Sequence, residues 1–285
     1  MYIAPLGSSV LICGKSGSGK STLLTNFITD ERFYKGWFKK IFLFSPTANG
    51  DDVQKALKIP KKHVFSNLEE APDLLEVIIR SQQEKLDGGG KAHTVDQFAV
   101  IFDDVIGDVQ FMNSKEFVKC FYQVRHVNCT TFICTQHFKR VPRVCRLQAN
   151  FIHYFACSQT EVDTLTEEFC PPRWKKQDFQ RMVNEATEDA YSFLTINMKV
   201  PWPIRFRKNL GEIISLNRSE ESSNKTKDGA DEQTGRGALG GKRAREGADW
   251  GDGGGGGRKA GRSEGGEVGY SVQAPDGQGA PNVHH

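Results

Sequence analysis

The chain of 285 residues has no run of apolar residues near the ~18–20 that a membrane-spanning helix needs. Its N-terminus lacks the layout of a signal peptide. Its seven cysteines are an odd number without a Cys-x-x-Cys pair, which argues against a disulfide framework and a classical zinc site. Cysteines within apolar runs, such as Cys13, Cys134 and Cys157, are expected to be small core residues. We therefore expect a soluble intracellular protein of a reducing compartment without a membrane span.

The net charge of the chain is small, and large aliphatic residues are few in its C-terminal part. The formal net charge of +3 is too near neutral to indicate a nucleic-acid-binding protein by itself. Residues 218–285 contain 18 of the 29 glycines, with ten basic and eleven acidic residues and few large aliphatic ones. Such a segment cannot bury enough apolar surface to offset its ordering entropy. We therefore predict a folded domain over residues 1–217 and a disordered tail over 218–285. The tail is expected to be a flexible solvating segment, and the alternative is that its basic clusters are weak nuclear-targeting or nucleic-acid-binding patches.

A phosphate-binding loop lies near the N-terminus, between an apolar run and a helical pattern. It reads Gly14-x-x-x-x-Gly19-Lys20-Ser21, and its glycines Gly14, Gly17 and Gly19 can adopt positive φ so that backbone N–H groups converge on phosphate oxygens. Lys20 is expected to reach the β- and γ-phosphates of ATP, and Ser21 to offer a hydroxyl to Mg²⁺. The expected nucleotide-binding residues are Gly14, Lys15, Ser16, Gly17, Ser18, Gly19, Lys20, Ser21 and Thr22.

An acidic pair, Asp103-Asp104, follows the apolar run Phe98–Phe102. A buried strand that ends in a carboxylate places it at the carboxyl edge of a parallel sheet, beside the phosphate loop. Asp103 is therefore the predicted second metal ligand, together with Ser21. Asp104 is the candidate to orient or deprotonate the attacking water, which implies hydrolysis rather than binding alone.

Two further residues are candidates for catalysis. Gln136 follows the apolar run Thr131–Thr135 and is either a sensor of the γ-phosphate or an ordinary loop glutamine. Arg125 ends a helical pattern, where it either complements the helix dipole or enters a neighbouring subunit's site as a trans-acting arginine. Basic residues at Arg140, Arg143 and Arg146 form a cluster whose contact with DNA is the less favoured interpretation from composition alone.

Apolar runs alternate with helical patterns over the predicted domain, which is typical of an α/β protein. We expect the three-layer sandwich of a P-loop NTPase, with a mostly parallel central sheet and helices on both faces. The predicted helices cover 21–29, 69–86, 114–124, 160–169 and 176–187. The predicted strands are Val10–Cys13, Ile41–Phe44, Phe98–Phe102, Thr131–Thr135, Phe151–Cys157, Tyr191–Ile196 and Ile204–Arg207.

Together these motifs resemble the genome-packaging ATPases of large eukaryotic DNA viruses, poxviruses among them, within the FtsK–HerA superfamily. The resemblance covers about residues 8–210, and the order and spacing of its motifs are more selective than the phosphate loop alone. Its motifs are Gly14-Lys-Ser-Gly-Ser-Gly-Lys-Ser21, Ile101-Phe-Asp-Asp104, Arg125-His126-x-Asn128, Phe132-Ile-Cys-Thr-Gln136, Val141-Pro142, Asn150, Asp178-Phe179 and Tyr191-Ser-Phe-Leu-Thr195.

The resemblance implies a homo-oligomeric ring, a pentamer or hexamer, that hydrolyses ATP and drives double-stranded DNA into a preformed capsid. Viral capsid or portal-vertex proteins would be its partners, at a host nuclear or cytoplasmic assembly site or in the virion. It further implies that Gln136 senses the γ-phosphate and that Arg125 acts in trans. Asp104 stands where the superfamily more often has Glu. We also expect Lys139, Arg140 and Arg143 to grip the DNA backbone.

Three other functions share the phosphate loop. A P-loop kinase for a nucleotide or other small molecule would need an acceptor pocket and an arginine-bearing lid, of which the sequence gives no compelling sign. A nucleotide-dependent binding protein would anchor DNA without moving it, and a replicative helicase would unwind a forked duplex. Phosphate transfer to a small acceptor, turnover near background, and unwinding of a fork are the respective observations that distinguish them.

Overall fold

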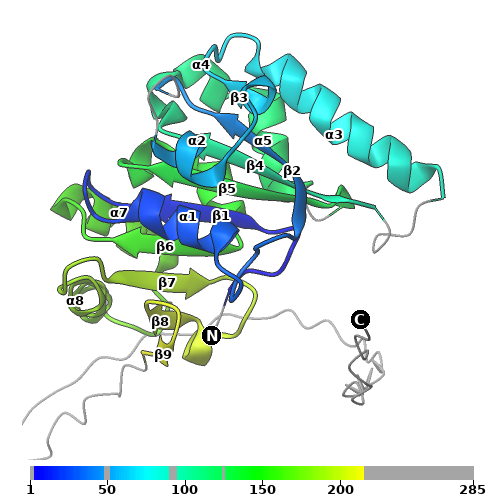
Figure 1. Ribbon diagram of the computed structural model, residues 1–285. Coiled ribbons are helices and arrows are strands. Elements are labelled where there is room, and N and C mark those ends of the chain that lie inside the picture. Colours follow the sequence, from blue (N-terminus) through cyan, green and yellow to red (C-terminus); the bar gives the residue numbers. More distant parts are fainter. Residues whose placement is uncertain (1–2, 48–51, 90–94, 124–125, 215–285) are drawn as a thin grey trace, which may run out of the picture. The chain divides into compact units, whose positions relative to one another are not determined.

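A nine-stranded sheet runs through the residues that the computed structural model describes, which are 3–47, 52–89, 95–123 and 126–214 (Figure 1). The predicted tail over 218–285 lies outside these residues. The strands follow the order β3-β2-β4-β5-β1-β6-β7-β8-β9 across the sheet. Their bounds are β1 Ser9–Cys13, β2 Phe38–Phe44, β3 Val64–Phe65, β4 Gln97–Asp103, β5 Cys129–Thr135, β6 Phe151–Phe155, β7 Phe193–Asn197, β8 Phe206–Lys208 and β9 Glu212–Ile213.

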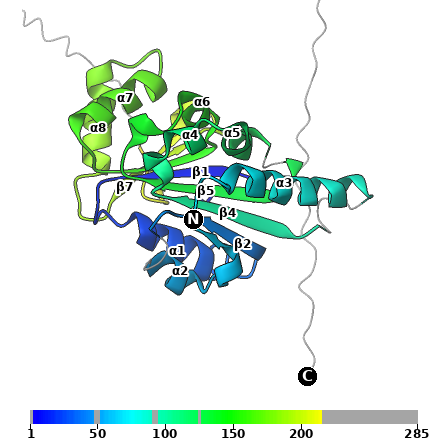
Figure 2. The ribbon, with the colours of Figure 1, turned by 90° about the horizontal axis from the view of Figure 1, so that it is seen from above.

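Helices cover both faces of the sheet, as predicted. Figure 2 shows α1 and α2 on one face and the other labelled helices on the opposite face. The α-helices are α1 Lys20–Thr29, α2 Asp52–Leu57, α3 Ala71–Asp87, α4 Val109–Met112, α5 Lys115–Tyr122, α6 Arg143–Gln148, α7 Gln159–Phe169 and α8 Lys176–Ala186. Short 3₁₀ helices lie at Lys61–His63, Val105–Gly107, Phe138–Arg140 and Trp202–Ile204.

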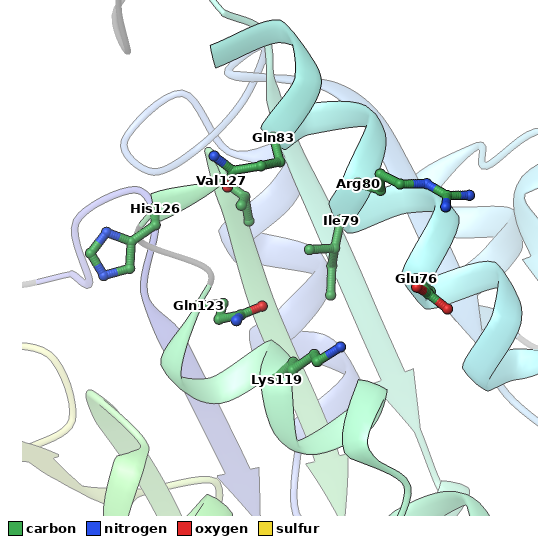
Figure 3. A pocket seen from close by; sticks show the side chains of 8 residues that line it. All are labelled: Glu76, Ile79, Arg80, Gln83, Lys119, Gln123, His126 and Val127. Carbon is green, nitrogen blue, oxygen red and sulfur yellow. The ribbon is translucent and has the colours of Figure 1, made fainter. Parts of the chain in front are cut away.

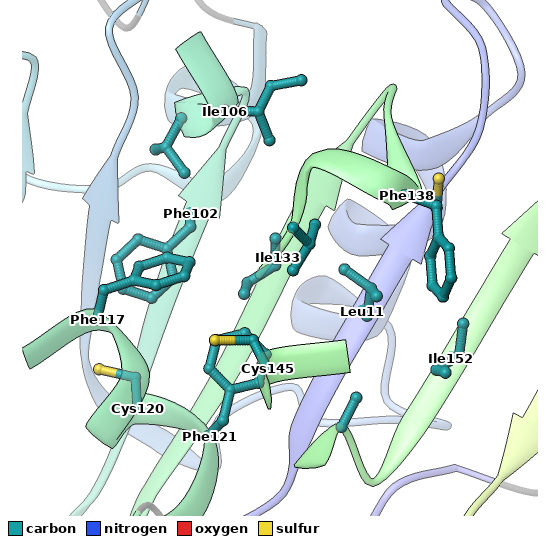
Figure 4. Close-up of a cluster of buried hydrophobic side chains, with 14 of the residues drawn as sticks. Leu11, Phe102, Ile106, Phe117, Cys120, Phe121, Ile133, Phe138, Cys145 and Ile152 are labelled. Atoms are coloured by element: carbon teal, nitrogen blue, oxygen red, sulfur yellow. The ribbon is translucent and has the colours of Figure 1, made fainter. Parts of the chain in front are cut away.

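The central strands are apolar along their whole length because side chains on both faces are buried under helices. All five residues of β1 are buried, as are all seven of β5. Beneath α3, α5 and α7 lies the larger of two apolar clusters, in which the rings of Phe102 and Phe117 are 5.0 Å apart (Figure 4). The second cluster packs beneath α1 and α2 and includes Phe27. These two layers hold the central strands rigidly in place.

The sheet is mostly parallel, as predicted, but β7, β8 and β9 are antiparallel. Two helices, α7 and α8, connect β6 to β7 and pack against each other. Since β7 is antiparallel to β6, the chain leaves α8 and enters β7 at the carboxyl edge of the parallel strands. The predicted strand over Ile204–Arg207 starts only at Phe206, since Trp202–Ile204 forms a 3₁₀ turn that contains Pro203.

Candidate nucleotide site

The phosphate loop links β1 to α1, and backbone hydrogen bonds fasten it to both neighbouring strands. The amide of Gly14 donates to the carbonyl of Thr135 at the end of β5, over 3.1 Å. The amide of Lys15 donates to the carbonyl of Ala156 after β6, over 3.4 Å. Gly17 and Gly19 have φ of 74° and 101°, the left-handed conformation predicted for them.

Gly14 serves a different purpose from the one predicted, because its φ is not positive. A Cβ atom at this position would lie 2.6 Å from Cβ of Phe155 and 2.6 Å from the Ser18 hydroxyl oxygen. Real Cβ atoms do not approach other atoms so closely, so a side chain here would displace β6 or the loop. Gly14 is therefore required for close packing rather than for backbone conformation.

The loop presents unmatched donors where a phosphate would lie. The N-cap of α1 is Gly19, which offers no side-chain acceptor to the first N–H groups of the helix, and the first turn contains no acidic residue. The buried hydroxyl of Ser18 has no hydrogen-bond partner among the described residues. A phosphate group fits this cradle because its oxygens accept hydrogen bonds and because the positive end of the helix dipole favours an anion.

Lys20 closes the loop from within. Its Nζ donates to the carbonyl of Gly14 over 2.8 Å and to the carbonyl of Lys15 over 2.9 Å. The ammonium group thus lies at the concave side of the loop and holds both carbonyls. An incoming phosphate can replace these two neutral acceptors with charged oxygens, which form stronger hydrogen bonds.

The acidic pair lies at the same edge of the sheet. Asp103 is the last residue of β4 and pairs in register with Cys134 of β5, the strand between β4 and β1. Asp104 has a φ of 51°, and its amide donates to the Cys134 carbonyl over 3.1 Å. A left-handed backbone is uncommon for residues other than glycine, and aspartate is one of the few that adopt it.

Gln136 lies between the phosphate loop and the acidic pair. The register of β5 with its neighbours decides this, since Thr135 pairs with Cys13 and Cys134 pairs with Asp103. Gln136 is half-buried and comes directly after Thr135, whose hydroxyl accepts a hydrogen bond from the His137 amide over 3.1 Å. The structure therefore brings Gln136 to the same edge as Gly14 and Asp104.

A family model described as "Poxvirus A32 protein" matches residues 8–197, from the strand before the phosphate loop to the end of β7. The chain belongs to the poxvirus A32 protein family. This confirms the predicted resemblance, and the matched segment contains every predicted site residue. No curated protein sequence matches the chain significantly.

Solved structures show the same fold in relatives that are more distant from this A32 family member. The DNA-packaging ATPase B204 from Sulfolobus Turreted Icosahedral Virus has a TM-score of 0.50 at 13% identity, covering 74% of this chain and 100% of its own. The genome packaging NTPase B204 from Sulfolobus turreted icosahedral virus 2, in complex with AMPPCP, has a TM-score of 0.51 at 13% identity, covering 73% and 99%. EssC (ATPases 2 and 3) from Geobacillus thermodenitrificans has a TM-score of 0.50 at 10% identity, covering 75% and 41%. These similarities confirm the P-loop NTPase fold.

Arg125 lies outside the described residues, so its predicted role stays a prediction. The described residues on either side of it, Gln123 and His126, come just before β5, at the sheet edge opposite the phosphate loop. A cavity of about 440 Å³ lies at this place, between α3 and α5. Figure 3 shows the side chains that line it. Arg80 and Lys119 line it together with Gln123 and His126.

The predicted basic cluster divides into exposed and buried members in this A32 family protein. Lys139, Arg140 and Arg143 are exposed and line a groove of about 460 Å³ beside the loop that follows β4. Arg146 is buried instead, and its guanidinium pairs with Glu168 of α7. Arg146 is thus a structural residue although it borders the same groove. The exposed Arg143 also approaches Glu168, with 3.5 Å between Nε and Oε1.

The sequence places Tyr191 in a predicted strand and in a motif of the resemblance, but it indicates no role for this residue in the site. The strand β7 starts two residues later, and Tyr191 has a φ of 63° with 72% of its surface exposed. Its ring lies beside Gly19, and both Tyr191 and Gly17 line a pocket of about 300 Å³ with Ser18. Nothing in the local sequence marks this position, because the contact joins residues far apart in the chain.

The described part of the chain contains no helix that combines the length and apolar character needed to cross a membrane. Within the same ranges, no group of three or more His, Cys, Asp or Glu residues could hold a metal ion by itself. In nucleotide sites Mg²⁺ is usually held by one or two protein ligands together with phosphate oxygens and water.

Proposed function

We propose that this chain is an ATP-hydrolysing motor that moves double-stranded viral DNA into a preformed capsid. The observation that carries the proposal is the convergence of Lys20, Asp104 and Gln136 on one sheet edge in a member of the A32 family. Structures named as viral DNA-packaging ATPases support it further, since they share the fold along nearly their whole length.

The site residues divide the chemistry of hydrolysis between them. Lys20 and the N-terminus of α1 bind the phosphates, and Ser21 and Asp103 would hold Mg²⁺, which neutralises phosphate charge when it is bound. Asp104 accepts a proton from a water molecule as its oxygen attacks the γ-phosphorus. The bond from that phosphorus to the oxygen bridging it to the β-phosphate breaks, and ADP leaves. Gln136 donates a hydrogen bond to the γ-phosphate.

Tyr191 is proposed to stack on the adenine base. Its exposed ring borders the same pocket as the phosphate-loop residues Lys15 and Gly17. The turn before it is held by an ion pair between Lys208 and Asp189, with 2.6 Å between Nζ and Oδ2. An aromatic ring that is held in place beside the phosphate-binding loop can stack on a nucleotide base. Such stacking is favourable for every base, because each base has a flat π-face.

DNA is proposed to bind the exposed cations Lys139, Arg140 and Arg143. These residues follow Gln136 within a few positions, so a shift of the glutamine towards the γ-phosphate would move the start of their loop. Positioning contacts to phosphates carry no sequence information, which suits a motor that moves along any sequence. The groove beside these cations also includes apolar surface, from Val109 and Met112.

The active form is proposed to be a homo-oligomeric ring, a pentamer or a hexamer, that works with capsid or portal-vertex proteins at a viral assembly site in the infected cell. Arg125 is proposed to complete the neighbouring subunit's site, where its charge stabilises the transition state. The position of Gln123 and His126 at the opposite sheet edge supports a role in trans, because the chain's own phosphate loop lies at the far edge.

Displacement of a third DNA strand tests the proposal. A short oligonucleotide bound as a triplex on a long duplex is released only when a motor runs along that duplex. We expect release that requires ATP and is lost in Asp104→Asn. Release of an annealed strand from a fork, with the triplex left intact, would indicate a helicase. Phosphate transfer to a small acceptor without a response to DNA would indicate a kinase.

A further inference from the structure

Two cysteine thiols meet directly behind the phosphate loop. Cys13 is the last residue of β1 and precedes Gly14, while Cys157 follows β6. Their Sγ atoms are 4.0 Å apart although 144 positions separate the two residues in the chain. Both thiols are reduced.

The two thiols differ in exposure and acidity. Cys13 is completely buried, and this burial raises the pKa of its thiol. Cys157 is half-buried and lines a cavity of about 580 Å³ together with Gln180 and Asn184. The pKa of the Cys157 thiol is lowered, chiefly by the hydrogen bond that it shares with the Cys13 thiol, while its partial burial acts in the opposite direction. Cys157 is therefore the reactive thiol of the pair, and a small oxidant can reach it through the cavity.

We propose that Cys13 and Cys157 form a peroxide-sensitive thiol pair whose disulfide weakens nucleotide binding. The Cys157 thiolate attacks one oxygen of hydrogen peroxide, the O–O bond breaks, and a sulfenic acid and hydroxide form. The Cys13 sulfur then attacks the Cys157 sulfur, hydroxide leaves, and the proton of the Cys13 thiol is lost to it as water. In sum, two thiols and one peroxide give one disulfide and two water molecules.

Packing contacts connect the two cysteines to the phosphate loop, so formation of the disulfide would alter the nucleotide site. This effect on binding rests on the nucleotide-binding function proposed above. A disulfide has an S–S distance of about 2.05 Å, so the sulfur atoms must approach by about 2 Å. The carbonyl of Ala156, next to Cys157, accepts the hydrogen bond from the Lys15 amide in the phosphate loop. Phe155 packs so tightly on Gly14 that no Cβ fits between them. Movement of residues 155–157 therefore deforms the loop.

The test compares the full chain before and after treatment with hydrogen peroxide, followed by reversal with dithiothreitol. Peptide mass spectrometry maps the linked cysteines, and a fluorescent ATP analogue measures nucleotide affinity. We expect a Cys13–Cys157 link and a rise of about tenfold in Kd, in the range of common coupling energies. Dithiothreitol should restore the affinity. Because the wild-type chain serves in both states, this comparison does not depend on a variant that folds.

Two variants provide the controls. Cys157→Ser should lose both the link and the effect of peroxide on affinity. Cys170→Ser should keep both, since Cys170 is equally half-buried but burial raises the pKa of its thiol. Absence of the link in the oxidised wild type, or a link without weaker binding, would overturn the proposal. If the reduced protein failed to bind the analogue, the proposed nucleotide site would be wrong. The mass-spectrometric test for the Cys13–Cys157 link would still give a result in that case.

Discussion

Arg146 and Glu168 form a buried ion pair, in which a terminal guanidinium nitrogen and a carboxylate oxygen lie 2.5 Å apart. The same guanidinium donates to the carbonyl of Lys139 over 2.9 Å and to that of Val141. It also lies over the ring of Phe138, 5.4 Å from the ring centroid. One buried side chain therefore fixes the backbone of the basic loop to α7.

Replacing either partner of this pair is expected to be costly. Glu168→Leu leaves the buried Arg146 charge without its partner, which destabilises proteins by about 3–5 kcal/mol. Arg146→Met leaves the Glu168 carboxylate with only the exposed Arg143, whose Nε lies 3.5 Å from Oε1, so its cost is expected to be smaller. The double variant should lose less than the sum of the two single variants, because neither charge is then left unpaired. Urea unfolding of the four proteins measures this. Additive losses would show that the two side chains do not stabilise the fold as a pair.

The basic loop is expected to control the response to DNA. Replacing Lys139, Arg140 and Arg143 with Ala should lower the affinity for double-stranded DNA and flatten its dependence on salt, because fewer counterions are released on binding. Fluorescence anisotropy over a range of salt concentrations measures both. As a matched control, Lys55, Lys61 and Lys62 are three exposed lysines near β2 and β3. Equal losses in both triple variants would rule out a specific role for the loop.

Tyr191 is expected to bind the base but not the phosphates. Tyr191→Ala should weaken ATP binding by about tenfold, since stacking on an aromatic ring contributes about 1–3 kcal/mol. Tripolyphosphate, which has no base, should bind both proteins equally. Calorimetric titration of the two ligands distinguishes these effects, and Tyr191→Phe, which retains the ring, should behave as the wild type. A parallel loss of tripolyphosphate affinity would mean that the ring supports the phosphate loop instead.

His153 is expected to make the fold sensitive to acid. It is buried in β6, where burial lowers its pKa to about 3. The Thr195 hydroxyl donates to the carbonyl of Asn209, so it accepts a hydrogen bond from Nδ1–H of the neutral His153 ring. In the unfolded chain the His153 ring becomes protonated below pH ~6.5, whereas in the folded chain it becomes protonated only near the lowered pKa. The contribution of the neutral His153 ring to the free energy of unfolding is therefore complete above pH ~6.5 and is lost as the pH falls towards 3.

The pH dependence of unfolding tests this relationship. Wild-type stability should fall by about 1.4 kcal/mol per pH unit more steeply than that of His153→Asn between pH ~6.5 and the lowest pH at which both fold. His126→Asn removes an exposed histidine and should retain the wild-type slope. Identical slopes in the wild type and His153→Asn, measured by denaturant unfolding at each pH, would show that His153 is protonated in the folded state.

The central strands and the phosphate loop could be predicted because their signals are local. Buried strands such as β4 are continuous apolar runs, and the loop has fixed residues at fixed spacing. Strand direction has no such signal. β7 is buried along its whole length like β6, and nothing in its residues marks it as antiparallel. The short strands β3 and β9 and the helices α2, α4 and α6 were missed because they are too short for a periodic pattern.

Among features that join distant parts of the chain, only those that follow from the order of the parallel strands could be predicted. The positions of Asp104 and Gln136 at one sheet edge were predicted from strand order, and the structure confirms that they lie there. The packing of Phe155 against Gly14 and the meeting of Cys13 with Cys157 depend on β6, which lies about 140 positions from the loop. Cys157 was expected to be a small core residue, but it is half-buried because it follows the strand and borders a cavity.

The rate of ATP hydrolysis by the purified full chain, with and without long double-stranded DNA, tests the central claim most directly. Light scattering on the same samples gives the mass of the active species, and Lys20→Ala and Asp104→Asn serve as inactive references. We expect an assembled species whose turnover rises with DNA and is abolished by either substitution. Turnover by a monomer that is indifferent to DNA would contradict the assignment of this chain as a DNA-packaging motor.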